Sequence, residues 1–362
     1  MIGYRRAPCP APAHSAPGLR KIHARAARTG AACLLLATGP ALSQSSWAEY
    51  RLATVLGTAF PWGQAGERWA ERVKEKTQGR IVIKLYPGTS LVGGDQTREF
   101  TAIRQGVIDL AIGSTINWSP QVKELNLFSL PFLMPDYAAI DALTQGPVGK
   151  DIFTRLERAG VVPLAWGENG FREVTNSKRE LRKPEDFKGL KFRVVGSPLF
   201  LDIFTALGAN PTQMSWADAQ PALASGAVDG QENPLSIFLA VKMHNFGQKN
   251  VTTWGYVADP LIFVVNKEVW QSWSKEDQKA VREAALEAGK YCIQLAREGM
   301  TGADPAIHKT IAGLGVNIVK LTPEERAAFV KVTRPVYDKW SKQIGAELVK
   351  KAEAAVASRK KN

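Results

Sequence analysis

Three patches between residues 170 and 234 decide how this chain folds, namely GFREVTNSKR (170–179), PEDFKGLKFRV (184–194) and GAVDGQENP (226–234). Polar and apolar residues alternate from Lys191 to Val194, after Gly189 ends a short helical turn that begins at Pro184. This alternation predicts a strand, so Arg193 is expected on a rigid element. Asn233 follows a polar pair and precedes a proline, which predicts a turn.

The side chains of Arg193 and Asn233 are the first candidates for a binding site. A guanidinium on a rigid strand offers a planar pair of donors that matches a carboxylate, and a turn amide can donate a further hydrogen bond. The residues alone leave an alternative open. Arg193 can form a structural salt bridge, for instance with Asp186 or Glu185, and Asn233 can simply shape its turn.

A fourth patch, ALGANPT (206–212), lies between the second and the third and is followed by Met214 and Trp216. The four patches in this order resemble the core of a TRAP-type solute-binding protein of the DctP family, the periplasmic component of a tripartite, ATP-independent carboxylate transporter. The resemblance implies an α/β, two-domain periplasmic-binding-protein-like fold. It further implies a ligand cleft between the domains and a long helix that spans both.

The resemblance also assigns roles to particular residues. It implies that Arg193 and Asn233 contact the ligand carboxylate. It places Arg172 as a second arginine of the site and Trp216 at an aromatic position near the ligand. These four residues are therefore expected to meet in the cleft.

The length and composition of the chain indicate two globular domains. The 362 residues are 45% hydrophobic and 22% charged, which is an ordinary composition but a length beyond one typical hydrophobic core. Residues 49–170 with about 260–300 are expected to form one α/β domain, and residues 171–259 with about 301–362 a second one that includes C-terminal helices. The net charge is +13, but no basic run is interleaved with aromatic residues, so a nucleic-acid partner is not expected.

Residues 1–48 are predicted to be a secretory leader. They contain basic residues and no acid, with an apolar run from Ala31 to Leu42 and small-residue cleavage options at Ser43 or Ala48. The run is shorter than the roughly 20 apolar residues that span a bilayer, which argues against a membrane anchor. The expected location is the periplasm, and since Cys292 is the one cysteine after the leader, no internal disulfide is expected.

Alternating strand and helix patterns follow the leader. Periodicity predicts strands at Tyr50–Val55 and Arg80–Tyr86, helices up to Val73 and over Thr97–Gln105, and buried strands at Leu110–Ile112, Val161–Trp166 and Leu261–Val265. The short apolar runs at Leu110 and Val161 suit a parallel sheet covered on both faces. In such an open sheet ligands collect at loops beyond the strand ends, so the cleft is expected there, with a hinge near Gly170 and Pro260.

Two helix starts are recognisable in the C-terminal part. Ser274 is placed to cap a long helix whose apolar spacing continues past Lys290. Thr322-Pro323-Glu324-Glu325 has the cap, proline and acid of a second start. The Lys/Ala-rich tail from Lys350 is expected to be frayed.

No catalytic or metal centre is predicted. His244 and His308 lie outside any nucleophile motif, no Cys/His cluster has metal-ligand spacing, and no cofactor is implied. Asp229 and Glu232 could form an acid–base pair, but nothing else of a glycosidase site accompanies them, so they are interpreted as turn-forming or structural groups. The chain is therefore predicted not to be an enzyme. The alternative is a periplasmic enzyme or a sensor ectodomain that uses the same cleft.

The predicted function is capture of a small organic acid by a monomer, closure over the acid, and delivery to the membrane permease subunits of the transporter. Asp95 is a further candidate contact, in a loop with two glycines before it. Several tryptophans are also expected near the cleft: Trp62, Trp118, Trp166, Trp216 and Trp254.

A wall of several indoles favours a ligand with one carboxylate and an apolar or aromatic remainder, so a monocarboxylic hydroxy or oxo acid is predicted. The alternative is a C4-dicarboxylate, which needs a second cationic anchor opposite Arg193, and Arg172 is the only obvious candidate. Two departures from the family pattern argue against sialic acid. Ser114-Thr115 stands where sialic-acid-type members have an acidic residue, and Pro260 stands in place of a glutamine.

Overall fold

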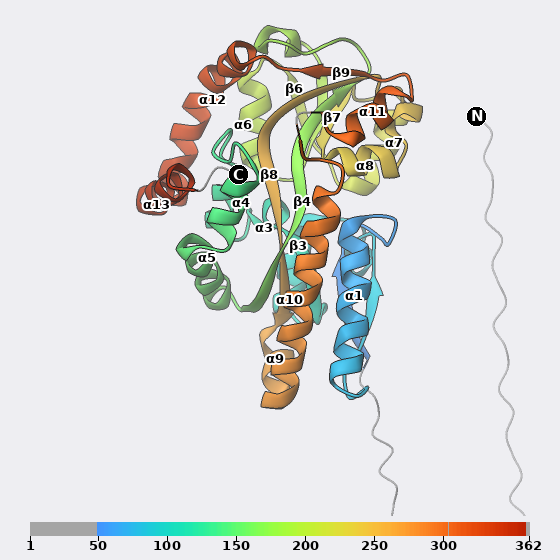
Figure 1. Ribbon diagram of the computed structural model, residues 1–362, viewed down its shortest axis with the longest axis vertical. Helices are drawn as coiled ribbons and strands as arrows, with labels where there is room; N and C mark the ends of the chain where they lie inside the picture. The colour runs from blue at the N-terminus through green and yellow to red at the C-terminus, as the bar shows by residue number, and fades with distance from the viewer. Residues whose placement is uncertain (1–48, 303, 360–362) are drawn as a thin grey trace, which may run out of the picture. The chain divides into compact units, whose positions relative to one another are not determined.

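The computed structural model describes residues 49–302 and 304–359 (Figure 1). The predicted leader, residues 1–48, and its cleavage options lie outside the described residues. Within the described ranges, no helix has the length and apolar character needed to cross a bilayer.

A mixed sheet of nine strands runs through the described part of the chain in the order β2-β1-β3-β8-β4-β7-β5-β6, with β9 paired to β8. The strands at each end of the sheet pair in parallel: β1 with β2 and β3, and β5 with β6 and β7. Its centre is antiparallel, because β8 runs against β3 and β4, and β4 against β7. The strands are β1 (Glu49–Thr54), β2 (Val82–Tyr86), β3 (Leu110–Ser114), β4 (Val161–Asn176), β5 (Lys191–Val194), β6 (Asn210–Gln213), β7 (Gly230–Asn233), β8 (Asn250–Asn266) and β9 (Asn317–Lys320).

The parallel sheet predicted around Val161–Trp166 is therefore wrong, and at Leu110–Ile112 it is right for one neighbour only. The apolar runs indicate that both faces of these strands are buried. Such burial does not distinguish parallel from antiparallel pairing. On β8, Leu261 and Phe263 belong to one cluster of buried apolar side chains and Ile262 and Val264 to the other. Since successive side chains point to opposite faces of a strand, β8 is covered on both sides.

The strands β4 and β8 are long and join the two halves of the fold. Figure 1 shows them running from the half that holds β3 and α1 to the half that holds β6 and β7. The sequence predicts only one end of each, Val161–Trp166 and Leu261–Val265. The pairing shifts register between Glu168 and Gly170, where Gly170 has a φ of +115° that glycine tolerates best. The predicted hinge falls at this irregularity and stays a prediction.

Helices cover both faces of the sheet. They are α1 (Pro61–Lys76), α2 (Glu99–Arg104), α3 (Thr115–Trp118), α4 (Tyr137–Thr144), α5 (Pro147–Arg158), α6 (Pro198–Ala206), α7 (Trp216–Ala224), α8 (Leu235–Ala240), α9 (Lys267–Ser272), α10 (Lys275–Arg297), α11 (Ala306–Ala312), α12 (Pro323–Ile344) and α13 (Ala346–Ala357). Short 3₁₀ turns are η1 (Ser90–Val92), η2 (Gln96–Arg98), η3 (Lys123–Ser129), η4 (Pro184–Phe187) and η5 (Met243–Phe246). The predicted helix over Thr97–Gln105 is thus split into η2 and α2.

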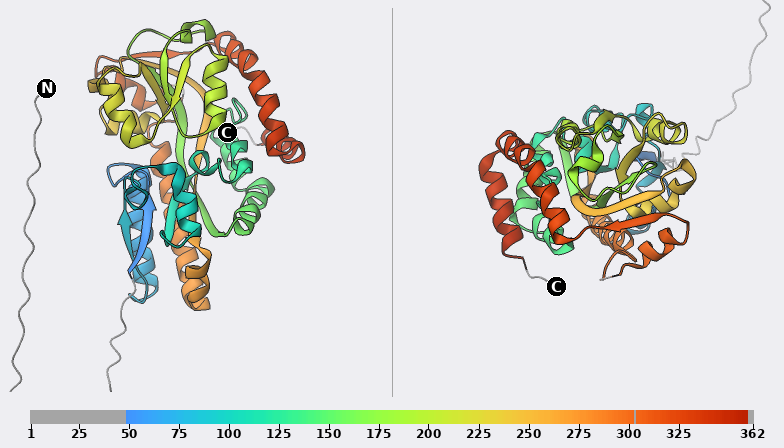
Figure 2. Two further views of the ribbon diagram at one scale, coloured as in Figure 1. Left: turned by 180° about the vertical axis from the view of Figure 1, so that it is seen from behind. Right: turned by 90° about the horizontal axis from the view of Figure 1, so that it is seen from above.

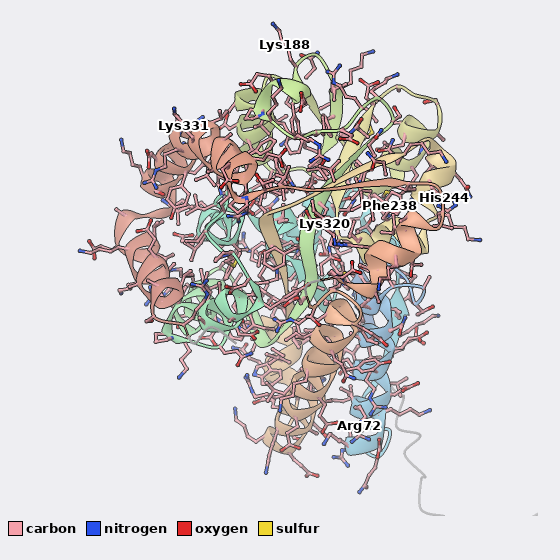
Figure 3. All side chains as sticks on the ribbon, turned by 45° about the horizontal axis from the view of Figure 1, so that its top comes forward. Arg72, Lys188, Phe238, His244, Lys320 and Lys331 are labelled. Atoms are coloured by element: carbon pink, nitrogen blue, oxygen red, sulfur yellow. The ribbon has the colours of Figure 1, made fainter. Side chains whose placement is uncertain are left out.

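The helices α1 and α10 pack side by side, and α10 also packs along β4. Arg72 of α1, labelled in Figure 3, donates from Nε to Oε2 of Glu287 on α10 at 2.8 Å. Lys76 approaches the other oxygen of Glu287, also at 2.8 Å. Because these groups are partly exposed, they orient the pair of helices more than they stabilise it.

The two helix starts predicted near the C-terminus are confirmed. Ser274 accepts a hydrogen bond from the backbone of Asp277 at 3.0 Å, and α10 then continues to Arg297. At α12, Thr322 and Glu325 form a reciprocal capping box.

The expectation of a frayed tail from Lys350 is wrong. The helix α13 continues to Ala357 and buries Ala352 and Val356, because it packs against α4 and α5 (Figure 2). The helix α12 packs against α6 and η3. The C-terminal helices therefore contact elements from both halves, and the predicted assignment of residues 301–362 to the second domain stays a prediction.

Candidate ligand-binding pocket

Residues from both halves of the fold line a small pocket beside the centre of β4 and β8, with a cavity volume of about 30 Å³. One wall is apolar and comes from the loop after β1, from α3, from the end of β5 and from α8. Its members are Val55, Leu56, Ile116, Val195 and Ile237. The opposite wall is polar and carries the buried charges described below.

Arg193 lies in β5 and lines this pocket with 1% of its surface exposed. Its Nε and one terminal nitrogen donate to the backbone carbonyl of Met214, at 3.0 and 2.9 Å. No carboxylate of the described residues lies within salt-bridge distance of it, so the predicted alternative of a salt bridge to Asp186 or Glu185 is wrong. Burial lowers the pKa of Arg193 to about 10, the charge of Glu232 opposes that effect, and the guanidinium stays charged at pH 7.

Arg172 lies in β4 and, unlike Arg193, is surrounded by acceptors. It donates to both carboxylate oxygens and the backbone carbonyl of Glu232, and to Oδ2 of Asp259 at 3.3 Å. Burial lowers its pKa, but the two carboxylates offset that effect, so the pKa of Arg172 is raised. Glu232 also accepts from the hydroxyl of Tyr256 at 2.8 Å. The interpretation of Glu232 as a structural group agrees with these contacts.

Asn233 is the last residue of β7 rather than part of a turn, and Pro234 follows it directly. Gly230 opens this strand, and a Cβ there would meet the carbonyl oxygen of Thr175 at 2.4 Å, so glycine lets β7 approach β4. The amide of Asn233 accepts from Arg172 at 3.1 Å and donates to Gln231 at 2.6 Å. Asn233 therefore lines the pocket with its polar atoms already engaged.

Asp259 lies in β8 and was not among the residues predicted from the sequence. It lines the pocket with 1% exposure and accepts from Ser114 at 2.5 Å, from Asn169 at 2.8 Å and from Arg172. Burial raises its pKa, and Arg172 opposes that rise. Asp259 is the one charged residue of β8, and a lone acid in a largely apolar strand is the local signal that could have found it. Only the pairing of β4 with β8 brings it opposite Gly170.

Of the predicted tryptophans, Trp62 and Trp216 line the pocket. Trp62 donates from its indole nitrogen to the carbonyl of Ile112 at 2.7 Å. The ring of Trp216 lies 5.7 Å from the guanidinium carbon of Arg193, within cation–π range.

The structure does not bring Trp254, Trp118 or Trp166 to the pocket. Trp254 is packed in an aromatic cluster with Phe187 and Tyr256. Trp118 is fully buried, and Trp166 stacks on an aromatic ring of α5. A large apolar side chain near a strand end can pack in the core as well as line a cleft. The sequence therefore does not separate core tryptophans from those that line the pocket.

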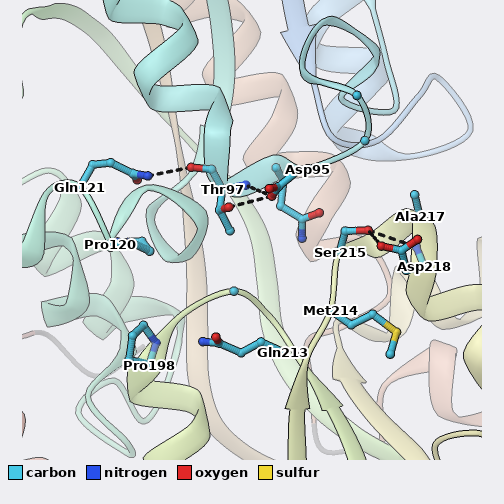
Figure 4. A pocket seen from close by; sticks show the side chains of 14 residues that line it. Asp95, Thr97, Pro120, Gln121, Pro198, Gln213, Met214, Ser215, Ala217 and Asp218 are labelled. Carbon is cyan, nitrogen blue, oxygen red and sulfur yellow. Dashed lines mark hydrogen bonds between the residues drawn. The ribbon is translucent and has the colours of Figure 1, made fainter.

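Asp95 lines a separate and wider groove, which we call the outer groove and which has about 1170 Å³ of open space (Figure 4). The carboxylate of Asp95 accepts from the backbone and the hydroxyl of Thr97, at 3.0 and 2.7 Å, and so caps η2. Gln96 lines both the outer groove and the pocket, and it accepts from the backbone nitrogen of Trp216 at 2.9 Å. This contact joins the two halves of the fold, and sequence reasoning missed it.

The residues that the structure describes contain no group of three or more His, Cys, Asp or Glu side chains placed to hold a metal ion. The pocket lies between two α/β halves of the fold, and both contribute residues to its lining. The family and the structural neighbours of this chain are transport solute-binding proteins, not enzymes.

The family model of the bacterial extracellular solute-binding proteins, family 7 (DctP), matches residues 52–343, and the chain belongs to this family. A C4-dicarboxylate-binding periplasmic protein DctP from Rhodobacter capsulatus is 31% identical over 333 residues, which cover 91% of this chain and 97% of that protein. The resemblance noted in the sequence is therefore confirmed over most of the chain.

Two solved TRAP periplasmic solute-binding proteins share the fold. One from Ralstonia eutropha, with bound (S)-2-hydroxy-2-methyl-3-oxobutanoate ((S)-2-acetolactate), is 69% identical with a TM-score of 0.85 and covers 86% of this chain and 99% of its own. One from Shewanella oneidensis, with bound succinate, is 28% identical with a TM-score of 0.79 and covers 85% of this chain and 99% of its own. The two ligands differ in their number of carboxylates.

Proposed function

We propose that this chain captures a small monocarboxylic hydroxy or oxo acid in the pocket and delivers it to the membrane subunits of a TRAP transporter. The observation that carries the proposal is Arg193, a buried guanidinium whose hydrogen-bond acceptor within the described residues is a backbone carbonyl. A buried cation without a carboxylate partner is costly, and an incoming carboxylate removes that cost. Arg193 is the proposed anchor.

The charges that line the pocket favour one carboxylate over two. Arg172 is neutralised by Glu232 and Asp259, so it is not available as a second anchor. A second ligand carboxylate would share the pocket with Asp259, which lines it, and repulsion between two buried anions is costly. The C4-dicarboxylate alternative therefore lacks the second cation that it needs.

The pocket also constrains the part of the ligand that lies beyond its carboxylate. The apolar wall and the two indoles of Trp62 and Trp216 suit a compact aliphatic group. The acid bound by the Ralstonia eutropha protein has one carboxylate, one hydroxyl, one oxo group and two methyl groups. At 69% identity, that ligand supports the same class for this chain.

Transport requires that a loaded protein differ from an empty one. We propose that the two halves close over the acid through the hinge near Gly170 and Pro260, and that residues 1–48 direct the chain to the periplasm. The bond from Trp216 to Gln96 and the contact of 3.3 Å between Ser119 and Ser197 hold the halves together beside the pocket. Scattering curves with and without saturating acid test closure, and identical curves would contradict it.

A thermal-shift screen of the purified mature chain tests the ligand class. Acetolactate, α-hydroxyisovalerate and α-ketoisovalerate are compared with succinate, galactonate and a neutral sugar at equal concentration. A ligand that binds only the folded state stabilises it by about 2.7 kcal/mol at 100 times its dissociation constant. We expect the branched monocarboxylates to give the largest shifts. Tighter binding of succinate than of every monocarboxylate, or hits only among neutral sugars, would contradict the proposal.

A further inference from the structure

Most polar groups around the pocket are already engaged with each other, but the side chain of Asn117 is not. It lines the pocket on α3 with 5% of its surface exposed. Throughout residues 49–302 and 304–359, no hydrogen-bond partner is found for its side-chain amide. The amide nitrogen and oxygen of Asn117 are not among the fully buried unpaired atoms of the described residues, so a ligand that displaces water from them must supply the hydrogen bonds that the water made.

The short helix that carries Asn117 is fixed at both ends. Ser114, before its first residue, accepts from the backbone of Ile116 at 3.1 Å and donates to Asp259 at 2.5 Å. Trp118, its last residue, donates to the buried carboxyl of Glu99 at 2.9 Å. Its indole also fills the space that a Cβ on Gly113 would need, since the nearest ring atom would lie 1.7 Å away. The backbone that carries Asn117 is thus held in place before a ligand arrives.

We infer that Asn117 is a specificity-determining residue that recognises the hydroxyl or oxo oxygen of the ligand, while Arg193 holds its carboxylate. This inference rests on the proposed function. An amide both donates and accepts, so it satisfies a hydroxyl in either direction and an oxo group as donor. The neighbouring Asn169 supports the same chemistry, because its nitrogen donates to Asp259 and its oxygen stays free of partners in the described part of the chain.

Paired ligands that differ by one hydroxyl test the inference. The affinities of α-hydroxyisovalerate and isovalerate are measured by calorimetry for the parent chain, for Asn117→Leu and for Asn126→Leu. Asn126 is the matched control, because it is equally buried but does not line the pocket. The readout is the ratio of the two affinities, which a general loss of stability leaves unchanged.

We expect Asn117→Leu to weaken α-hydroxyisovalerate roughly 10- to 100-fold, because the hydroxyl loses its partner, while isovalerate changes by less than about threefold. Asn126→Leu should keep the parent ratio. Equal losses for both acids in Asn117→Leu, or an unchanged ratio, would show that Asn117 only shapes the pocket. Asn117→Ala repeats the test if the leucine variant does not fold. If the parent chain binds no hydroxy or oxo acid of the thermal-shift screen, the proposed function fails and this inference fails with it.

Discussion

Two buried arginines face the same pocket from neighbouring regions of the sheet, and their surroundings are opposite. Arg172, in the region where β4 meets β7 and β8, contacts two carboxylates. Arg193, in the region of β5 and β6, contacts a backbone carbonyl and an indole face. In the first region the positive charge is paired with carboxylates in direct contact, and in the second region no carboxylate of the described residues lies within salt-bridge distance. Burial and residue type alone therefore do not separate the two arginines, whereas the presence or absence of a carboxylate in direct contact does.

Loss of stability should be largest when the paired arginine is removed. Arg172→Met leaves Glu232 and Asp259 as buried, unpaired carboxylates, and breaking such a pair costs about 3–5 kcal/mol. We expect that loss in chemical denaturation without ligand. Arg193→Met is the matched control and should lose clearly less, because it breaks no ion pair. Equal losses of stability in the two variants would contradict the conclusion that Arg172 is paired inside the protein and Arg193 is not.

Loss of affinity should follow the opposite order. Arg193→Ala should keep its fold and weaken acid binding by about 2–5 kcal/mol, since the ligand charge is enclosed without its partner. Arg193→Lys should restore only part of the affinity, because an ammonium does not reproduce the planar pair of donors. Calorimetric titration with acetolactate measures both. Parent-like affinity in Arg193→Ala would mean that the anchor lies elsewhere.

Selectivity between succinate and acetolactate should change when a charge beside Arg172 is removed. Asp259→Asn removes one anion beside Arg172, so we expect the affinity for succinate relative to acetolactate to rise about tenfold, or about 1.4 kcal/mol. Asp95→Asn is the control from the outer groove. It also tests the expectation from the sequence that Asp95 contacts the ligand, and we expect no change in selectivity there. A selectivity that is unchanged in Asp259→Asn would contradict the charge argument.

The smallest effect should come from Tyr256, which contacts Glu232, the partner of Arg172. Tyr256→Phe removes the hydroxyl that donates to Glu232, and a buried hydrogen bond of this kind contributes about 1 kcal/mol or somewhat more. Thermal unfolding should show this loss, while the affinity for acetolactate stays at the parent value. A loss of affinity larger than the loss of stability would place Tyr256 in the binding region instead.

The sequence alone determined the features that depend on neighbouring residues. The alternation around Phe192 gave the strand of Arg193, the caps at Ser274 and Thr322 gave two helix starts, and the four patches gave the family. The strand and the two helix starts follow from backbone preferences and local hydrogen bonds, which act over a few residues, whereas the family was indicated by resemblance. The position of Trp216 near the site was likewise implied by the resemblance.

Only the tertiary structure decided which charges are paired and which tryptophans are exposed to the pocket. Arg172 meets Glu232 across 60 residues of chain and Asp259 across 87. These contacts depend on the register of β4 against β7 and β8, and a shift of one residue would turn the side chains to the other face. Local patterns carry no information about register between distant strands. The availability of Arg193 for a ligand is therefore a property of the folded sheet, even though the strand that carries it could be predicted from the sequence.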